Sequence, residues 1–135
     1  MPFYSHHLST NKQTELIDIT STVKKSVSDS NIKEGICVVY IPHTTAGVTI
    51  NEAADPAVVT DIIKEINKII PFHDNYKHME GNSHAHIKSS LFGASIQIPV
   101  KNNTLTLGTW QGIYFCEFDG PRSRNFYVQI NGNDK

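Results

Sequence analysis

Hydrophobic positions recur with a helical period in one segment of the chain and follow no single period elsewhere. Helical spacing separates the apolar residues Val59, Ile62, Ile63, Ile66 and Ile70. Asp55 and Pro56 precede them as a helix cap and a first-turn residue, and Pro71 follows them as a terminator. The pattern therefore predicts a long helix between Asp55 and Pro71, with one face in the core.

Two shorter helices are predicted on weaker patterns. Thr20 or Ser21 can cap a helix that runs through Asn31, in which Val23 and Val27 lie four residues apart on one face. A second short helix is expected from His84 to Phe92. The residues between Pro71 and Ser83 have no period and many turn formers, and they are expected to form a long loop.

The remaining apolar segments predict strands. Phe3 to Asp18 is expected to form a strand pair that turns near Asn11, and Val48 to Asn51 a short strand. Ile36 to Ile41 is apolar or aromatic without alternation, which predicts a strand covered on both faces. Further strands are expected around Ile98, Leu105, Phe115 and Val128, with turns between them.

Strands at both ends and helices between them predict an α+β fold, with a mixed or antiparallel sheet curled into a sandwich or barrel and two main helices. A length of 135 residues suits one domain, 1–135. No apolar run approaches the roughly 20 residues that cross a bilayer, so no membrane role is expected. Without an export signal, and with Cys37 and Cys116 in apolar segments as reduced thiols, a cytoplasmic location is expected.

The charge of the chain argues against one class of ligand, nucleic acids. Twelve basic and thirteen acidic side chains give a formal net charge of -1. The chain also has no basic stripe interleaved with aromatic residues, so nucleic-acid binding is not expected. An anionic ligand would have to be bound by a local cluster of donors.

Histidines supply the clearest candidate chemistry. Three of the seven, His78, His84 and His86, fall within nine polar residues, and His43 lies in another polar segment. Imidazole suits proton transfer near neutral pH and binds metal ions. His43, His78 and His86, with Glu80, are candidate ligands of a divalent metal such as Zn²⁺, although their spacing matches no zinc motif. The alternative is that these histidines form hydrogen bonds to loop backbone or face solvent. Of the four, His84 is the one expected to have no part in the site.

Carboxylates and donors extend the candidate site. Glu52 has no obvious structural task and is a candidate general base or Mg²⁺ ligand, whereas Asp55 is better explained as a helix cap. Asn82 lies in a polar turn before the predicted helix 84–92, at whose start backbone N–H groups favour anions, and Lys88 and Ser89 lie within that helix. Arg122 and Arg124 suit bidentate capture of phosphate oxygens, or else form surface ion pairs. Trp110 could stack on a flat ligand ring, but a structural role is more common.

Several strings of the sequence resemble one known family. They are PHTTAGVTINE at 42–52, EGNS at 80–83, AHIKSSL at 85–91, LGTWQGI at 107–113 and DGPR at 119–122. In this order they resemble the YjbQ family, also called the secondary thiamine-phosphate synthases, over nearly the whole chain. The matched motif positions are His43, Glu52, Asp55, His78, Glu80, His86, Lys88, Trp110 and Arg122.

The resemblance implies a cytoplasmic homotrimer with an α+β fold and a weak thiamine-phosphate synthase activity. In that reaction the thiazole phosphate nitrogen attacks the methylene of hydroxymethylpyrimidine diphosphate and pyrophosphate leaves. Cations stabilise departing pyrophosphate, so Lys88, Arg122 and Arg124 are expected to bind it, with Ser89, Asn82 and Trp110 as further substrate contacts. His43, His86 and Glu52 are the expected catalytic residues, and a divalent metal, Mg²⁺ or Zn²⁺, is a possible cofactor.

Two other functions compete with this expectation. The three candidate imidazoles also suit a metal-dependent hydrolase. The same residues would equally suit a noncatalytic trimeric module that binds a small phosphorylated metabolite.

Overall fold

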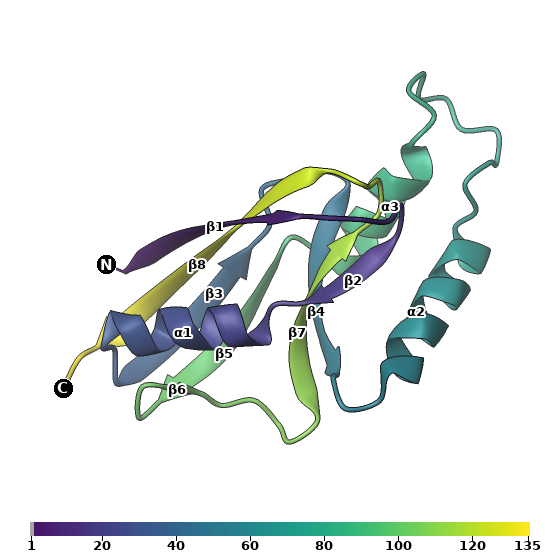
Figure 1. Cartoon of the computed structure of the whole chain (residues 1–135). Coiled ribbons are helices and arrows are strands. Elements are labelled where there is room, and N and C mark those ends of the chain that lie inside the picture. Colours follow the sequence, from purple (N-terminus) through teal and green to yellow (C-terminus); the bar gives the residue numbers. More distant parts are fainter. Residues whose placement is uncertain (1) are drawn as a thin grey trace.

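Eight strands and three helices follow one another along residues 2–135, the part of the chain that this computed structural model describes (Figure 1). They are, in order, β1 (Phe3–Ser9), β2 (Glu15–Asp18), α1 (Thr20–Ser30), β3 (Glu34–Tyr40), β4 (Ala46–Glu52), α2 (Pro56–Ile69), α3 (Ser83–Phe92), β5 (Ser95–Lys101), β6 (Thr104–Leu105), β7 (Gln111–Glu117) and β8 (Ser123–Asn133).

The strands form two antiparallel sheets. The larger has the order β1-β8-β3-β5-β6 and the smaller the order β2-β7-β4. Every strand pair in them is antiparallel, so the antiparallel alternative of the prediction holds rather than the mixed one. The α+β prediction and the curled sheet are confirmed.

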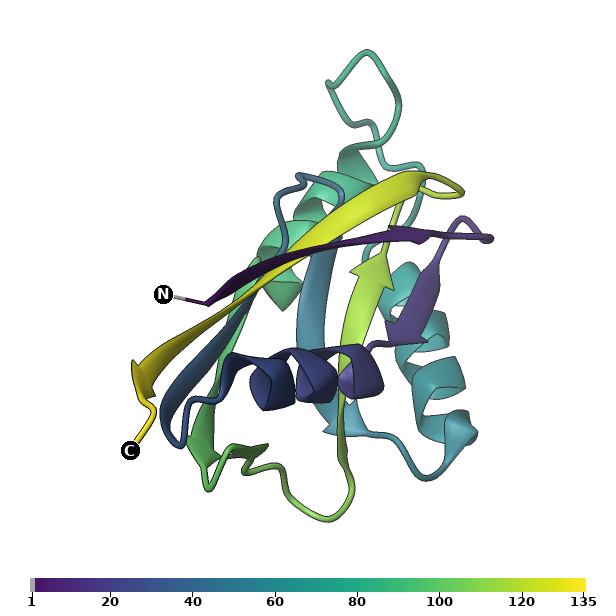
Figure 2. The same ribbon diagram turned by 60° about the vertical axis from the view of Figure 1, so that its left-hand side comes forward.

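The main core lies between the two sheets and α1, which crosses one face of the large sheet (Figure 2). Val23 and Val27 of α1 are fully buried there, as their spacing predicted. A second apolar cluster lies on the other face of the small sheet. There Ala85 of α3 is buried and Ile62 and Ile63 of α2 are partly buried, so α2 and α3 cover this face.

One strand is covered on both faces, but it is β7 and not β3. In β7, Ile113 and Phe115 face the main core while Tyr114 and Cys116 face the second cluster. The expectation that Ile36–Ile41 would be covered on both faces is wrong, because Ile36 and Tyr40 remain 45% and 47% exposed. Their side chains project from the outer face of the large sheet, which no helix covers.

The helix termini follow local side-chain chemistry. Asp55 caps α2 as predicted, with its Oδ1 accepting the N–H of Ala57 at 2.9 Å. The prediction that Thr20 or Ser21 caps α1 is corrected: Thr20 is already helical, and Asp18 accepts its N–H at 2.9 Å. The segment 84–92 is helical as expected and begins one residue earlier, at Ser83.

Two further observations concern membrane-spanning helices and the cysteines. None of the helices within residues 2–135 combines the length and apolar character needed to cross a membrane. Cys37 and Cys116 are buried free thiols, and burial raises the pKa of Cys37 to about 12.

Candidate functional site

A cavity of about 710 Å³ opens where the segment after β3, the loop before α3 and the start of β8 meet. We call it the histidine cavity. Its lining comprises Tyr40, Ile41, Pro42, His43, Thr44, Thr45, His78, Glu80, Asn82, His86, Ala94, Arg122 and Arg124. Seven of the predicted site residues therefore line one cavity: His43, His78, Glu80, Asn82, His86, Arg122 and Arg124.

His43 is held by the backbone of β8. Its Nε2 accepts the N–H of Asn125 at 2.9 Å and lies 3.1 Å from the carbonyl oxygen of the same residue. The pairing of β3 with β8 ends at Tyr40 and Tyr127. Two residues before Tyr127, the His43 ring rather than the β3 backbone bonds to Asn125 of β8. Burial lowers the pKa of His43 below its usual 6.5, and the positive charges of Arg124 and Arg122 lower it further.

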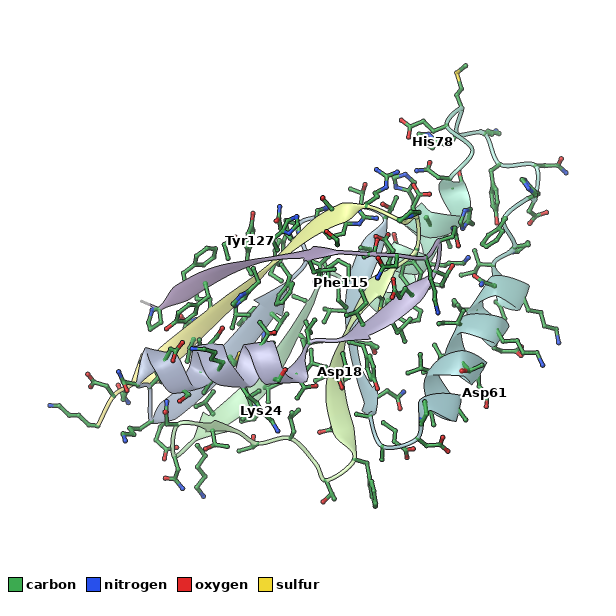
Figure 3. The ribbon with its side chains drawn as sticks, in the orientation of Figure 1. Asp18, Lys24, Asp61, His78, Phe115 and Tyr127 are labelled. Carbon is green, nitrogen blue, oxygen red and sulfur yellow. The ribbon has the colours of Figure 1, made fainter. Side chains whose placement is uncertain are left out.

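His78 and His86 form an edge-to-face pair across the cavity wall. Their ring centroids lie 5.2 Å apart, and Nε2 of His78 is 3.9 Å from Oε2 of Glu80. His78 comes from the loop that projects beyond the sheets (Figure 3), whereas His86 lies on α3. In residues 2–135, no three His, Cys, Asp or Glu side chains lie close enough together to hold a metal ion.

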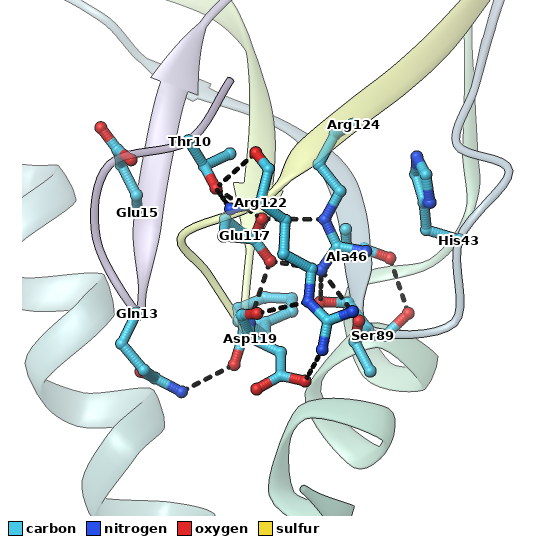
Figure 4. Close-up of polar contacts among 12 residues, drawn as sticks. Thr10, Gln13, Glu15, His43, Ala46, Ser89, Glu117, Asp119, Arg122 and Arg124 are labelled. Carbon is cyan, nitrogen blue, oxygen red and sulfur yellow. Dashed lines mark hydrogen bonds and ion pairs between the residues drawn. The ribbon is translucent and has the colours of Figure 1, made fainter. Parts of the chain in front are cut away.

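Arg124, which lines the cavity, forms a buried ion pair with Glu117 (Figure 4). Arg124 and Glu117 are 4% and 0% exposed, and both carboxylate oxygens accept hydrogen bonds from the guanidinium. Burial favours the protonated acid, but bonds from Arg124, the Asp119 N–H and the Thr10 hydroxyl outweigh it, so the pKa of Glu117 is lowered. Arg124 also donates to Thr45, and its charge is thus largely committed to the protein.

Arg122 is the more accessible cation, with its side chain 49% exposed. It donates to the carboxylate of Asp119 at 2.7 Å and to the carbonyl oxygen of the same residue at 2.8 Å. Asn82 donates to Asp119 from its Nδ2 at 2.9 Å, while its own Oδ1 is buried without a partner among residues 2–135. This acceptor lies beside the first turn of α3, in the cavity wall.

Lys88 was expected to bind a substrate phosphate, but its side chain is fully buried and outside the cavity lining. Its Nζ donates to Asn67 of α2 at 2.7 Å, lies 3.2 Å from Nδ1 of His84 and stands 4.6 Å from the ring centroid of Phe72. Burial lowers the pKa of Lys88 to about 8. The cluster joins α2, α3 and the loop between them, so His84 and Lys88 act in packing here.

Three other predicted residues lie outside the histidine cavity. Ser89 lines an adjoining cavity with His43 and His86, and its hydroxyl donates to Ala46 at 2.6 Å. Glu52 and Trp110 lie together at the far end of β4, where Glu52 pairs with Gln111. At about 3.4 Å per residue, six residues of strand place Glu52 roughly 20 Å from Ala46. Within one subunit, neither Glu52 nor Trp110 joins the histidines.

Sequence reasoning missed the residues that orient the arginines. Glu117 ends an apolar strand, Asp119 stands in a segment expected to be a turn, and Thr45 lies between His43 and the next expected strand. A carboxylate at the end of a buried strand is itself a signal, because an acid is rarely buried without a partner. The motifs PHTT and DGPR thus include residues that hold Arg122 and Arg124 in place.

Comparisons with known proteins agree on one family. The family model described as "UPF0047 protein YjbQ-like" matches residues 4–133. The UPF0047 protein MJ1081 of Methanocaldococcus jannaschii is 55% identical over 130 residues, covering 96% of this chain and 94% of that protein. The UPF0047 protein YugU of Bacillus subtilis is 50% identical over 126 residues, 93% of this chain and 96% of its own length.

Solved structures show the same fold. A YjbQ/UPF0047 family protein from Clostridium acetobutylicum, described as uncharacterized, has 55% identity and a TM-score of 0.93, covering 95% of this chain and 99% of its own. A protein from Sulfolobus solfataricus, SSO2532, has 37% identity and a TM-score of 0.94, covering 97% of this chain and 96% of that one.

These relatives overturn the expected activity. They are described only as UPF0047 proteins, as uncharacterized or, for SSO2532, as being of unknown function, and none of these descriptions gives a thiamine-phosphate synthase activity. The prediction of that activity was wrong. It inferred a reaction from a family resemblance, although one fold supports many chemistries. The resemblance itself is confirmed along nearly the whole chain: the protein belongs to the UPF0047 (YjbQ-like) family.

Proposed function

We propose that the histidine cavity binds a small phosphorylated metabolite. The observation that carries this proposal is the meeting of His43, His78 and His86, from separate parts of the chain, in one cavity with Arg122 and Asn82. Arg122 and the first turn of α3 would bind phosphate oxygens. The three imidazoles are placed to donate a proton to the bound molecule or accept one from it.

The electrostatics of His43 support an anionic ligand. Burial lowers the pKa of His43 most, and the nearby guanidinium groups of Arg124 and Arg122 lower it further, against an opposing effect of Glu117. A bound dianion would offset the positive charge of the guanidinium groups and stabilise the imidazolium. Asn82 lines the same part of the cavity and donates from Nδ2 to Asp119, the carboxylate that also holds Arg122.

Sulfate tests the charge requirement, because it keeps two negative charges through the neutral and mildly acidic range. We expect isothermal titration calorimetry to show one sulfate per chain, bound more tightly as the pH falls through the pKa of His43, which is lowered from its usual value. Arg122→Ala should weaken binding about ten- to a hundredfold, because it removes charge-assisted hydrogen bonds. Lys24→Ala, which removes an exposed cation of α1, is the matched control.

Equal sulfate affinity in wild type and Arg122→Ala would refute the proposal. A pH-independent affinity would show that no cavity histidine responds to the anion. His43→Gln separates the contribution of His43 from those of His78, His86 and Glu80, because it should remove only part of the pH dependence.

Metal-assisted hydrolysis is the second candidate. The His78–His86 pair and Glu80, 3.9 Å from His78, supply the residue types of a common zinc ligand set, but they are not close enough together to hold an ion as they stand. These side chains would have to turn toward a shared ion. Sulfate titrations with and without one equivalent of Zn²⁺ distinguish the two functions: the metal-dependent function requires the ion before sulfate binds.

We also propose that the chain acts in the cytoplasm as a homotrimer, with its buried thiols reduced. The support for assembly is the outer face of the large sheet, which exposes Phe3, Ile36 and Tyr40. Tyr40 also lines the histidine cavity, so a subunit contact on this face would approach the ligand. Light scattering should give a molar mass three times 15.1 kDa, and a mass of 15.1 kDa would refute the trimer.

A further inference from the structure

A second cavity adjoins the histidine cavity at His78 and His86. It has a volume of about 480 Å³, and these two imidazoles line it together with Tyr76, Lys77, Ser83 and Ile87. We call it the Tyr76 cavity. We infer that it is a subsite for an apolar, ring-sized group of the ligand, so that the substrate class is phosphate monoesters of such groups. This inference rests on the proposed function.

The two cavities share a wall rather than lying on separate faces. The His78 and His86 rings meet edge to face, with centroids 5.2 Å apart, and each ring lines both cavities. A ligand whose phosphate lies near Arg122 would therefore extend over these rings to reach the Tyr76 cavity. The ester linkage would then lie beside two groups able to transfer protons.

The lining of the Tyr76 cavity differs in chemistry from that of the histidine cavity. The histidine cavity includes Arg122, Arg124 and Glu80, whereas neither a carboxylate nor a guanidinium from residues 2–135 lines the Tyr76 cavity. Tyr76 provides an aromatic face, and Ile87 is an aliphatic residue of α3 that remains 39% exposed. Covering such surface with an apolar group removes it from water.

Tyr76 is also fixed in position before any ligand binds. Its hydroxyl donates to the carbonyl oxygen of Pro71 at 2.7 Å, which ties the ring to the start of the loop. Ile87 is held independently of that loop by the helical backbone of α3. An aromatic group between these two side chains would pack on a ring from one side and on an aliphatic chain from the other.

Two monoesters with the same head group test the subsite. We expect calorimetry to show that wild-type protein binds phenyl phosphate about tenfold more tightly than methyl phosphate, since the two differ only in the apolar group. Tyr76→Ala and Ile87→Ala should each remove most of this preference and leave the methyl phosphate affinity unchanged. Tyr76→Phe keeps the ring and should keep the preference.

Leu91→Ala is the matched control, because Leu91 is an exposed aliphatic residue one turn beyond Ile87 that lines neither cavity. Ile87→Ala also guards against a disturbed loop in Tyr76→Ala. Equal affinity of wild type for the two esters, or a preference that survives in both alanine variants, overturns the subsite while the proposed function stands. Failure of methyl phosphate to bind at all overturns the proposed function and the subsite with it.

Discussion

Replacing Glu117 by glutamine is expected to lower the free energy of unfolding by about 3 to 5 kcal/mol, because it leaves a buried guanidinium without its counter-ion. Arg124 is 4% exposed and bonds both carboxylate oxygens of Glu117. Thr10 and the backbone of Asp119 donate to the same carboxylate, so the substitution disturbs several bonds together. Urea unfolding followed by circular dichroism measures the change.

The pH dependence gives a second measure of the same pair. Hydrogen bonds hold the pKa of folded Glu117 below its usual value of 4.5, although burial alone would raise it. A lowered folded-state pKa stabilises the fold fully above pH 4.5 and loses this contribution as the pH falls through the folded-state value. The difference in stability between wild type and Glu117→Gln should therefore shrink in acid.

Asp29→Asn provides the control for charge removal alone. Asp29 pairs with Lys25 on the exposed surface of α1, where solvent screens the pair and leaves it little effect on stability. A Glu117→Gln variant as stable as Asp29→Asn would show that the buried pair is not needed for folding. Glu117→Met combined with Arg124→Met should recover much of the loss, because no buried charge remains.

Gly35→Ala is expected to cost about 3 kcal/mol or more, at the upper end of overpacking effects. Gly35 pairs directly with Gly132 across β3 and β8. A Cβ on Gly35 would lie 2.0 Å from the carbonyl oxygen of Asn131, a backbone atom that can move only if the strands separate. The same unfolding measurement, or the midpoint of thermal unfolding, reports the loss.

Gly108→Ala is the matched substitution at a permissive position. Its added Cβ would lie 3.3 Å from the side-chain oxygen of Gln111, which can move aside. This variant should lose less than about 1 kcal/mol, within the usual range for a surface change. If Gly35→Ala were equally mild, the close approach of β3 and β8 would not be required for the fold.

The two apolar segments 36–41 and 59–70 show how far sequence predicts this fold. The longer segment has a helical period and is preceded by the capping residue Asp55, two local signals, and the helix was predicted correctly. The shorter one lacked alternation, which suggested cover on both faces. Which sheet face is covered depends on where α1, α2 and α3 pack, and the strand sequence does not contain that information.

The candidate site was predictable in part for a similar reason. The polar residues clustered in sequence around His86 lie together in one cavity wall. His43, which is distant in sequence, lines the same cavity because the start of β4, just after it, contacts α3 through Ser89 and Ala46. Glu52 was grouped with His43 because it lies in the same motif, but β4 separates the two along its length. Lys88 was predicted to bind a ligand. The sequence does not show that its side chain is covered by Asn67 of α2 and by Phe72 of the following loop.

The backbone bond to His43 has a consequence for ligand recognition. Because Asn125 of β8 holds Nε2, the ring keeps one orientation whether the cavity is filled or empty. Ordering a mobile side chain on binding typically costs about 0.5 to 1.5 kcal/mol, and this ring incurs little of that penalty. Since Nε2 is the acceptor in the bond to Asn125, the neutral ring carries its proton on Nδ1, so a ligand that meets Nδ1 must accept a hydrogen bond.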